Sequence, residues 1–109
     1  MQASAHKYGA IRTEVDGVVF ASKAEAHHYT ELKALQQAGV IRDLELQPRY
    51  PLTVNGLLCG TYVADFRYVD TASGDLVVTD VKGVRTPVYR LKRKLMEALY
   101  RIRILEVTA

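Results

Sequence analysis

Hydrophobic and polar positions repeat with a helical period in two segments of the chain. The first segment lies between Ser22, which suits an N-cap with Glu25 three residues later, and Gly39, which suits the position after a helix end. The second follows Thr86-Pro87, an N-cap with proline at the first helical position. Its apolar residues fall on one face, namely Val88, Leu91, Leu95, Ala98 and Leu99. The pattern predicts a helix from Ser22 to Gln37 or Ala38 and a second helix from Pro87.

Strand-like patterns occupy most of the chain between and after these helices. They cover residues 41–54, 61–69, 76–82 and 102–107, with a short extended piece at 18–20 after the Asp16-Gly17 turn. Asn55-Gly56 is typical of a two-residue hairpin turn, and Pro48 and Pro51 mark an edge or a bulge in the first strand. The order of helix, three-stranded antiparallel meander, helix and strand predicts an α/β sandwich.

Size and composition are those of one globular domain. The chain has 109 residues and a mass of 12.2 kDa, and 49% of it is hydrophobic and 25% charged. We expect a loose N-terminus over residues 1–7 and one domain over 8–109. No apolar run approaches the roughly 18 residues needed to span a bilayer, and the N-terminus has no apolar signal core. One cysteine, Cys59, excludes a disulfide within the chain. A cytoplasmic protein without a membrane partner is therefore expected.

Basic residues are concentrated near the end of the chain. Residues 1–80 contain seven Lys and Arg against ten Asp and Glu, whereas residues 81–103 contain eight basic residues and one acidic residue. Such an asymmetry indicates either a face that binds a polyanion or a solvated helix face, and charge alone favours neither. The candidate DNA-binding residues are Arg85, Arg90, Lys92, Arg93 and Lys94.

Acidic residues are predicted to converge on the meander. Because side chains alternate along a strand, Asp80 and Lys82 share one face of the third strand. If the meander pairs as its turns suggest, Gln47, Asp65 and this pair line up across that face. Two carboxylates that converge repel each other unless a cation lies between them, and hard oxygen ligands suit Mg²⁺ or Mn²⁺. A cation held in this way can activate water against a phosphodiester, and a nearby lysine can offset the developing charge.

Glu25 has two interpretations that its position leaves open. It can complete the capping box with Ser22, which contributes roughly a few tenths to 1 kcal/mol. It also shares a helical stripe with Leu32 and Leu35, which should face the sheet. An acid on that stripe needs a partner, which a metal ion or a basic residue of the site would supply.

Four segments together resemble the PD-(D/E)XK nuclease superfamily, and more narrowly a family of small phage and prophage proteins of otherwise unassigned function within it. They are Ser22-Lys23-Ala24-Glu25, Leu46-Gln47-Pro48, Tyr62-Val63-Ala64-Asp65-Phe66 and Asp80-Val81-Lys82-Gly83. The resemblance covers about Lys7 to Val107. A lone Asp-x-Lys is a weak motif, but this order of segments is more specific. Ala64 replaces the proline for which the superfamily is named, a position with no ligand role.

The resemblance implies a restriction-endonuclease-like αβββαβ core, with a mixed sheet flanked by helices. It implies that Asp65 and Asp80 bind catalytic Mg²⁺, which Mn²⁺ would replace, with help from the Val81 carbonyl. It further implies that Lys82 positions or activates the attacking water. Glu25 would be an additional acidic residue of the metal site, and Gln47 an accessory polar residue. The implied reaction is hydrolysis of a DNA phosphodiester to a 5′-phosphate and a 3′-hydroxyl.

Three functions are compatible with the sequence. The first is a Mg²⁺-dependent DNA endonuclease of phage recombination, repair or packaging, which would act in the bacterial cytoplasm with partner proteins of those processes. As a homodimer it would offer two sites to two strands. The second is a non-catalytic DNA-binding or scaffold protein that keeps the nuclease fold. The third is an interaction module in which Asp80 and Lys82 form only a surface ion pair worth about 0–1 kcal/mol. Metal binding is required by the first alone.

Overall fold

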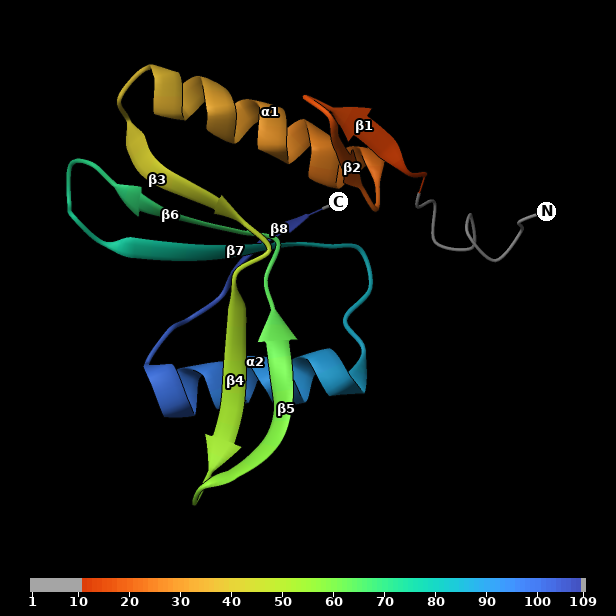
Figure 1. The fold of residues 1–109 in the computed structure, drawn as a ribbon, viewed down its shortest axis with the longest axis vertical. Helices are drawn as coiled ribbons and strands as arrows, with labels where there is room; N and C mark the ends of the chain where they lie inside the picture. Colours follow the sequence, from red (N-terminus) through yellow and green to blue (C-terminus); the bar gives the residue numbers. More distant parts are fainter. Residues whose placement is uncertain (1–10, 109) are drawn as a thin grey trace.

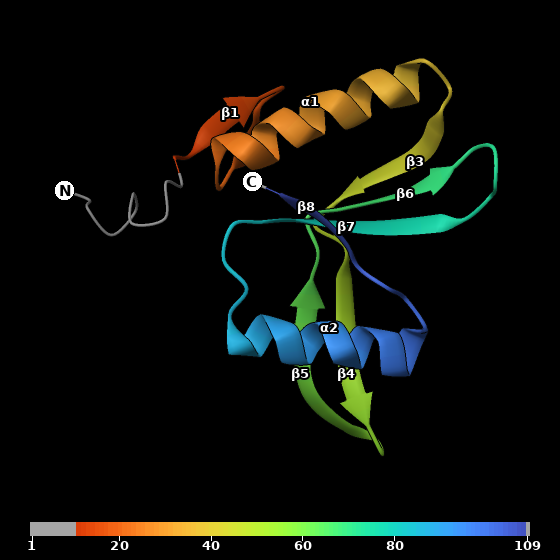
Figure 2. The same cartoon turned by 180° about the vertical axis from the view of Figure 1, so that it is seen from behind.

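The computed structural model describes residues 11–108, in a mixed α/β fold of three layers. A central sheet separates α1 (Lys23–Gln37) from α2 (Pro87–Tyr100), as Figures 1 and 2 show. A small hairpin of β1 (Thr13–Val15) and β2 (Val18–Phe20) lies beside α1. The predicted loose N-terminus over residues 1–7 lies outside the described residues. No helix among the described residues is long and apolar enough to cross a membrane.

The central sheet has four strands, in the order β3, β6, β7, β8. Their bounds are Ile41–Leu46 for β3, Phe66–Asp70 for β6, Leu76–Lys82 for β7 and Leu105–Thr108 for β8. The first three pair antiparallel, as the meander predicts, and β8 runs parallel to β7. The sheet is therefore mixed, with α2 as the crossover between its two parallel strands.

Two of the predicted strands are each broken into two, and this bend shapes the molecule. Residues 41–54 form β3 and then β4 (Arg49–Val54), and the return segment forms β5 (Leu57–Val63) and then β6. The first break occurs at Gln47, whose backbone is left-handed with φ of 52°. The second occurs opposite it, where Gln47 N–H donates to the Asp65 carbonyl and Ala64 N–H donates to the Pro48 carbonyl. Both chains therefore turn together, and the β4–β5 hairpin leaves the sheet (Figure 1).

Capping and turn chemistry is found where the sequence predicts it. Ser22 caps α1 by accepting the Glu25 N–H at 3.1 Å, and Gly39, with φ of 80°, follows the helix end. Thr86 caps α2 by accepting the Tyr89 N–H. Asn55 and Gly56 both have positive φ and join β4 to β5 in a two-residue turn. The ends of these elements are therefore determined by interactions between residues that are close in sequence.

The core has two parts, one on each face of the central sheet. Under α1 it contains Phe20, Ala26, Tyr29, Leu32, Ile41 and Phe66. Under α2 and the β4–β5 hairpin it contains Tyr50, Leu52, Tyr62, Ala64, Val78, Tyr89, Met96 and Ile104. Leu32 is buried on the α1 stripe as expected, but Leu35 is exposed. On α2 the buried residues are Tyr89 and Met96, and the apolar stripe that begins at Val88 lies largely in solvent.

Candidate active site

Asp65 lies in the two-residue break between β5 and β6, beside the central strand β7. Its Oδ2 accepts the backbone N–H of Val81 at 2.7 Å, and its own N–H donates to the Thr79 carbonyl at 3.2 Å. Asp65 therefore makes hydrogen bonds to β7 that a residue of a regular neighbouring strand would make. Its side chain is held against the β7 backbone. This anchoring brings the Asp65 carboxylate next to Asp80.

Asp80 is buried in the middle of β7, with only 2% of its surface exposed. Its Oδ2 accepts a short hydrogen bond from the Tyr62 hydroxyl of β5. Its Oδ1 lies 3.3 Å from Nζ of Lys82, two residues along the same face. Both oxygens of this buried carboxylate are thus engaged, as burial of a charge requires.

The two carboxylates share a site that water does not fully reach. Burial, the hydrogen bond with Asp80 and the charge of Asp80 raise the pKa of Asp65 to about 8, against the opposing effect of the Val81 N–H. Burial beside a second carboxylate therefore favours the protonated form of Asp65. A cation with hard ligand preference can take the place of that proton.

Glu25 contributes to the same electrostatic environment from the first turn of α1. Its side chain is buried at 8% exposure. Burial and the charge of Asp80 raise the pKa of Glu25, whereas Lys82 lowers it. The Glu25 N–H donates to Ser22 Oγ at 3.1 Å, which is the Ser22 half of a capping box. The Glu25 side chain lies within the electrostatic influence of Asp80 and Lys82, and its part in a metal site stays a prediction.

Gln47 adjoins this cluster through its backbone, since its N–H donates to the Asp65 carbonyl at 3.0 Å. It lies at the kink between β3 and β4, where its left-handed backbone interrupts the alternation that predicted its direction. Its side chain is exposed and makes no hydrogen bond to any of the acidic residues in the described part of the chain. A residue with positive φ interrupts the alternation of side chains along a strand, so the alignment of the Gln47 side chain with Asp65 and Asp80 stays a prediction.

The donors at this site suit a magnesium ion by type. The carboxylate oxygens of Asp65 and Asp80 are hard ligands, and two carboxylates are a number with which proteins often bind Mg²⁺. The contact that the structure shows for the Val81 backbone is the N–H donated to Asp65. Within residues 11–108 there is no group of three or more His, Cys, Asp or Glu side chains arranged to hold a metal ion. A bound Mg²⁺ would therefore complete its coordination with water or substrate oxygens, as this ion usually does.

Two tyrosines complete the site, and the sequence analysis did not include them. Tyr62 donates to Asp80, and Nζ of Lys82 lies 4.2 Å from the ring centroid of Tyr89. Lys82 is thus held between a carboxylate and an aromatic face, which orients its ammonium group. A hollow of about 260 Å³ opens beside them, between β5 and the start of α2. A buried tyrosine in an otherwise apolar strand is the signal that could have identified Tyr62, since its hydroxyl needs a partner.

The basic residues on α2 and just before it divide into two groups. Arg85 and Arg93 each pair with Glu106 of β8 at 2.8 Å, and Lys92 donates to the Thr61 carbonyl at 2.9 Å. Arg90 and Lys94 are exposed, and neither forms an ion pair within residues 11–108. Of the five predicted DNA-binding residues, these two have side chains directed to solvent without an internal partner.

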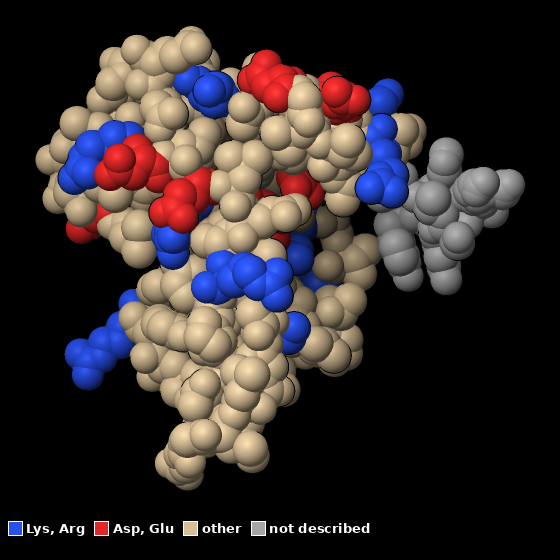
Figure 3. All heavy atoms as spheres, viewed as in Figure 1, with Lys and Arg blue, Asp and Glu red and all other residues tan. Residues whose placement is uncertain are grey.

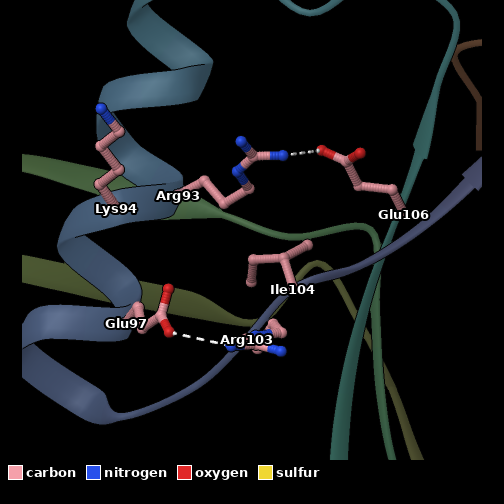
Figure 4. Close-up of a pocket in the computed structure, with 6 residues that line it drawn as sticks. All are labelled: Arg93, Lys94, Glu97, Arg103, Ile104 and Glu106. Carbon is pink, nitrogen blue, oxygen red and sulfur yellow. Dashed lines mark hydrogen bonds and ion pairs between the residues drawn. The ribbon is translucent and has the colours of Figure 1, made fainter.

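Figure 4 shows a second hollow, of about 400 Å³, between α2 and β8. Arg93 and Lys94 line it from the helix, and Arg103 from the segment before β8. The Arg93–Glu106 pair spans the hollow, and Arg103 contacts Glu97 at 3.5 Å. Its two arginines are thus balanced by acidic residues of the protein itself.

Glu106 connects β8 to α2 through three donors. The Tyr89 hydroxyl, Arg85 and Arg93 all donate to it and lower its pKa to about 2. Since the folded protein prefers the ionised form, this stabilisation is present above the ordinary pKa of about 4.5 and is lost as the pH falls toward 2. We expect Glu106→Gln to lower the free energy of unfolding by about 2 kcal/mol at pH 7. Urea denaturation at a series of pH values measures both effects.

Glu97→Gln is the matched control for this prediction. The Glu97–Arg103 pair is mostly exposed, and such pairs contribute about 0–1 kcal/mol. If Glu106→Gln were no more destabilising than this control, the Glu106 cluster would not be a tie between β8 and α2.

The fold and the site together define a small α/β protein with a buried carboxylate pair and an adjacent lysine. The chain belongs to a family described as protein of unknown function (DUF1064), whose model matches residues 5–108. Comparison with curated proteins and with solved structures finds no match.

Proposed function

We propose that this protein is a Mg²⁺-dependent DNA endonuclease that hydrolyses phosphodiester bonds. The observation that carries the proposal is the meeting of Asp65 and Asp80 in a buried pair, with Lys82 at 3.3 Å from Asp80. Two carboxylates that meet in a buried site repel each other and so are costly to the folded protein, and a pair that served only structure would be more stable as neutral side chains. A cation bound between the two carboxylates would offset their repulsion.

The order of elements supports a restriction-endonuclease-like core. Helix α1 precedes the antiparallel β3, β6 and β7, and α2 leads to the parallel strand β8. Asp65 precedes β6 and Asp80 lies within β7, so the two acids come from adjacent strands of the meander. With the four sequence segments, this arrangement favours a PD-(D/E)XK nuclease and, through that resemblance, a task in phage DNA recombination, repair or packaging.

Each residue of the site has a distinct task in this mechanism. Asp65, Asp80 and the Val81 backbone would hold Mg²⁺. The ion would lower the pKa of a bound water and stabilise charge on the phosphate oxygens. Val81 N–H donates to Asp65 Oδ2 and so holds that carboxylate against β7. The Tyr62 hydroxyl fixes the rotamer of Asp80. These contacts hold the ligands in place before substrate arrives, which limits reorganisation during reaction.

Lys82 would act on the substrate side of the site. Its ammonium group is held by Asp80 and Tyr89 at the edge of the hollow beside β5. From there it would orient the attacking water and offset the negative charge that grows on the phosphate. Attack of water on phosphorus would break the bond between phosphorus and the 3′ oxygen, so that the products are a 5′-phosphate and a 3′-hydroxyl.

Metal binding tests the proposal without requiring the correct DNA substrate. We expect wild type to bind Mn²⁺ in calorimetric titration, with an affinity that rises about tenfold per pH unit from pH 6 to 8, because the metal displaces a proton from a pair in which the pKa of Asp65 is about 8. Asp65→Asn should abolish binding, and Asp75→Asn, at an exposed turn, should not. Absence of saturable Mn²⁺ binding by wild type would favour the non-catalytic DNA-binding protein instead.

DNA binding is expected to use the exposed flank of α2 that carries Arg90 and Lys94. Each phosphate contact releases counterions, so the double variant Arg90→Ala/Lys94→Ala should bind DNA more weakly and reduce the slope of log affinity against log salt by about 2. Fluorescence anisotropy over a salt series measures this slope. The control Arg12→Ala/Lys33→Ala removes the same charge from the α1 side of the molecule. An equal loss in both variants would mean that net charge, and not this flank, attracts DNA.

A further inference from the structure

Glu106 of β8 lies beside the acidic site without being one of its metal-binding candidates. In the parallel pairing of β7 with β8, Glu106 is the partner of Asp80, so the two side chains leave neighbouring strands on the same face of the sheet. Neighbouring strands lie about 4.8 Å apart. Glu106 therefore adjoins the site, and its contacts show how it can act there.

Both carboxylate oxygens of Glu106 are occupied by donors of the protein. Oε1 accepts from Arg85 at 2.8 Å, and Oε2 accepts from Arg93 at 2.8 Å and from the Tyr89 hydroxyl at 2.7 Å. A carboxylate with three such donors is not free to bind an ion as the acidic pair would. Any effect of Glu106 on the site therefore passes through the groups that it holds.

Tyr89 is the group that extends from Glu106 to the acidic site. Its hydroxyl donates to Glu106, and its ring centroid lies 4.2 Å from Nζ of Lys82 and 6.4 Å from the ring centroid of Tyr62. Tyr89 is only 6% exposed. A cation is attracted to the face of an aromatic ring, more strongly where water is excluded. The direction of the Tyr89 ring therefore influences where the Lys82 ammonium group lies.

The other contacts of Lys82 leave room for this influence. Asp80 attracts it at 3.3 Å, but one ion pair leaves the flexible stem of a lysine free to rotate. Glu25 also attracts Lys82, without an ion pair between the two within residues 11–108. The β4–β5 hairpin, which forms one wall of the hollow, has no charged residue over 50–64, and Figure 3 shows it as an uncharged projection. The Tyr89 ring is thus the second contact that fixes the direction of the lysine.

We propose that Glu106 is a positioning residue for Lys82. Its hydrogen bond with the Tyr89 hydroxyl fixes the ring, the ring fixes the ammonium group, and the lysine is thereby placed for the hydrolysis proposed above. The effect on rate rests on that proposed function, whereas the arrangement of the three side chains does not. Glu106 thus has a role in the reaction in addition to its role as a tie between β8 and α2.

Nuclear magnetic resonance tests the arrangement without DNA or metal. In wild type, the Tyr89 ring current should shift the Hε protons of Lys82 upfield of those of Lys23, an exposed lysine at the start of α1. Tyr89→Phe keeps the ring but removes its bond to Glu106, so the upfield shift should decrease. Glu106→Ala should decrease it in the same way.

Single-turnover cleavage at saturating protein tests the effect on rate. Tyr89→Phe and Glu106→Ala should each lower the rate about tenfold, the lower end of what loss of a supporting contact costs at a reaction centre. The double variant should be no slower than the slower single variant, because both substitutions break the same link. Tyr89→Phe keeps the two arginine pairs of Glu106, and so separates this link from the tie between β8 and α2.

Tyr100→Phe is the matched control. It removes a hydroxyl bond of the same helix, to the Pro51 carbonyl, and should change neither the Lys82 resonance nor the rate. An unchanged Lys82 resonance in both Tyr89→Phe and Glu106→Ala would overturn the proposal, as would losses of rate that multiply in the double variant. If wild type cleaves no DNA, the proposed function fails, and the Lys82 resonance alone decides whether Glu106 positions the lysine.

Discussion

Asp80→Ala is expected to abolish metal-dependent DNA cleavage, with a loss of at least about 1000-fold in rate, at the upper end of what removal of one electrostatic stabiliser costs. Asp80 is the most buried acid of the site, and both its oxygens are held, by Tyr62 and by Lys82. Its removal takes away a metal ligand and leaves Asp65 alone to bind a divalent ion. DNA affinity should stay the same or rise, because a negative charge near the phosphate is lost.

Controls separate this loss from unfolding. Asp75→Ala removes an exposed acid at the start of the same strand region and should cleave like wild type. Circular dichroism of Asp80→Ala should retain the wild-type spectrum, and anisotropy should show intact DNA binding. Near-normal cleavage by Asp80→Ala and by Asp65→Ala would contradict the assignment of these carboxylates as metal ligands.

Lys82→Ala is expected to lower the cleavage rate by about 100-fold or more, with a smaller change in DNA affinity. The Lys82 ammonium group lies 3.3 Å from Asp80 Oδ1 and 4.2 Å from the Tyr89 ring centroid. Its position is therefore set before substrate binds, and its charge is available to the transition state. Single-turnover cleavage at saturating protein measures this step apart from binding.

Lys92→Ala is the matched control for Lys82→Ala. Lys92 lines the same hollow but donates to the Thr61 carbonyl, so it shares the charge and the location without contacting the acidic pair. A similar loss of rate in both variants would show a general attraction of DNA to this region. A change of less than a few-fold in Lys82→Ala would show that this lysine is structural.

Elements whose ends depend on local chemistry were predictable from the sequence. Ser22 and Thr86 accept backbone N–H groups three residues on, Gly39 follows α1, and the Asn55-Gly56 turn joins two strands, each as a local pattern indicates. The mixed α/β fold follows from the order of these elements. The β1 strand was missed because Thr13–Val15 lacks the continuous apolar run by which the equally short segment Val18–Phe20 was predicted.

The site was predictable where it depended on strand pairing and not where the backbone is irregular. Asp80 and Lys82 share a face because β7 is regular over its whole length. Asp65 reaches them through its bond to the Val81 N–H, although its own strand is broken, whereas Gln47 at the opposing kink turns to solvent.

The faces of α2 depend on tertiary structure, which its sequence pattern does not contain. Its buried side carries Tyr89 and Met96, which pack in the core with residues of the β4–β5 hairpin, whereas most of the apolar stripe lies in solvent.

Incubation of wild type and Asp80→Ala with supercoiled plasmid and with a four-way junction, in Mg²⁺, in Mn²⁺ and in EDTA, tests the central claim most directly. The account predicts that wild type cleaves at least one of these substrates with either metal ion, leaving 5′-phosphate ends, and that EDTA or the Asp80 substitution stops the reaction. Metal-independent binding of both DNAs by wild type, with neither substrate cleaved, would contradict it.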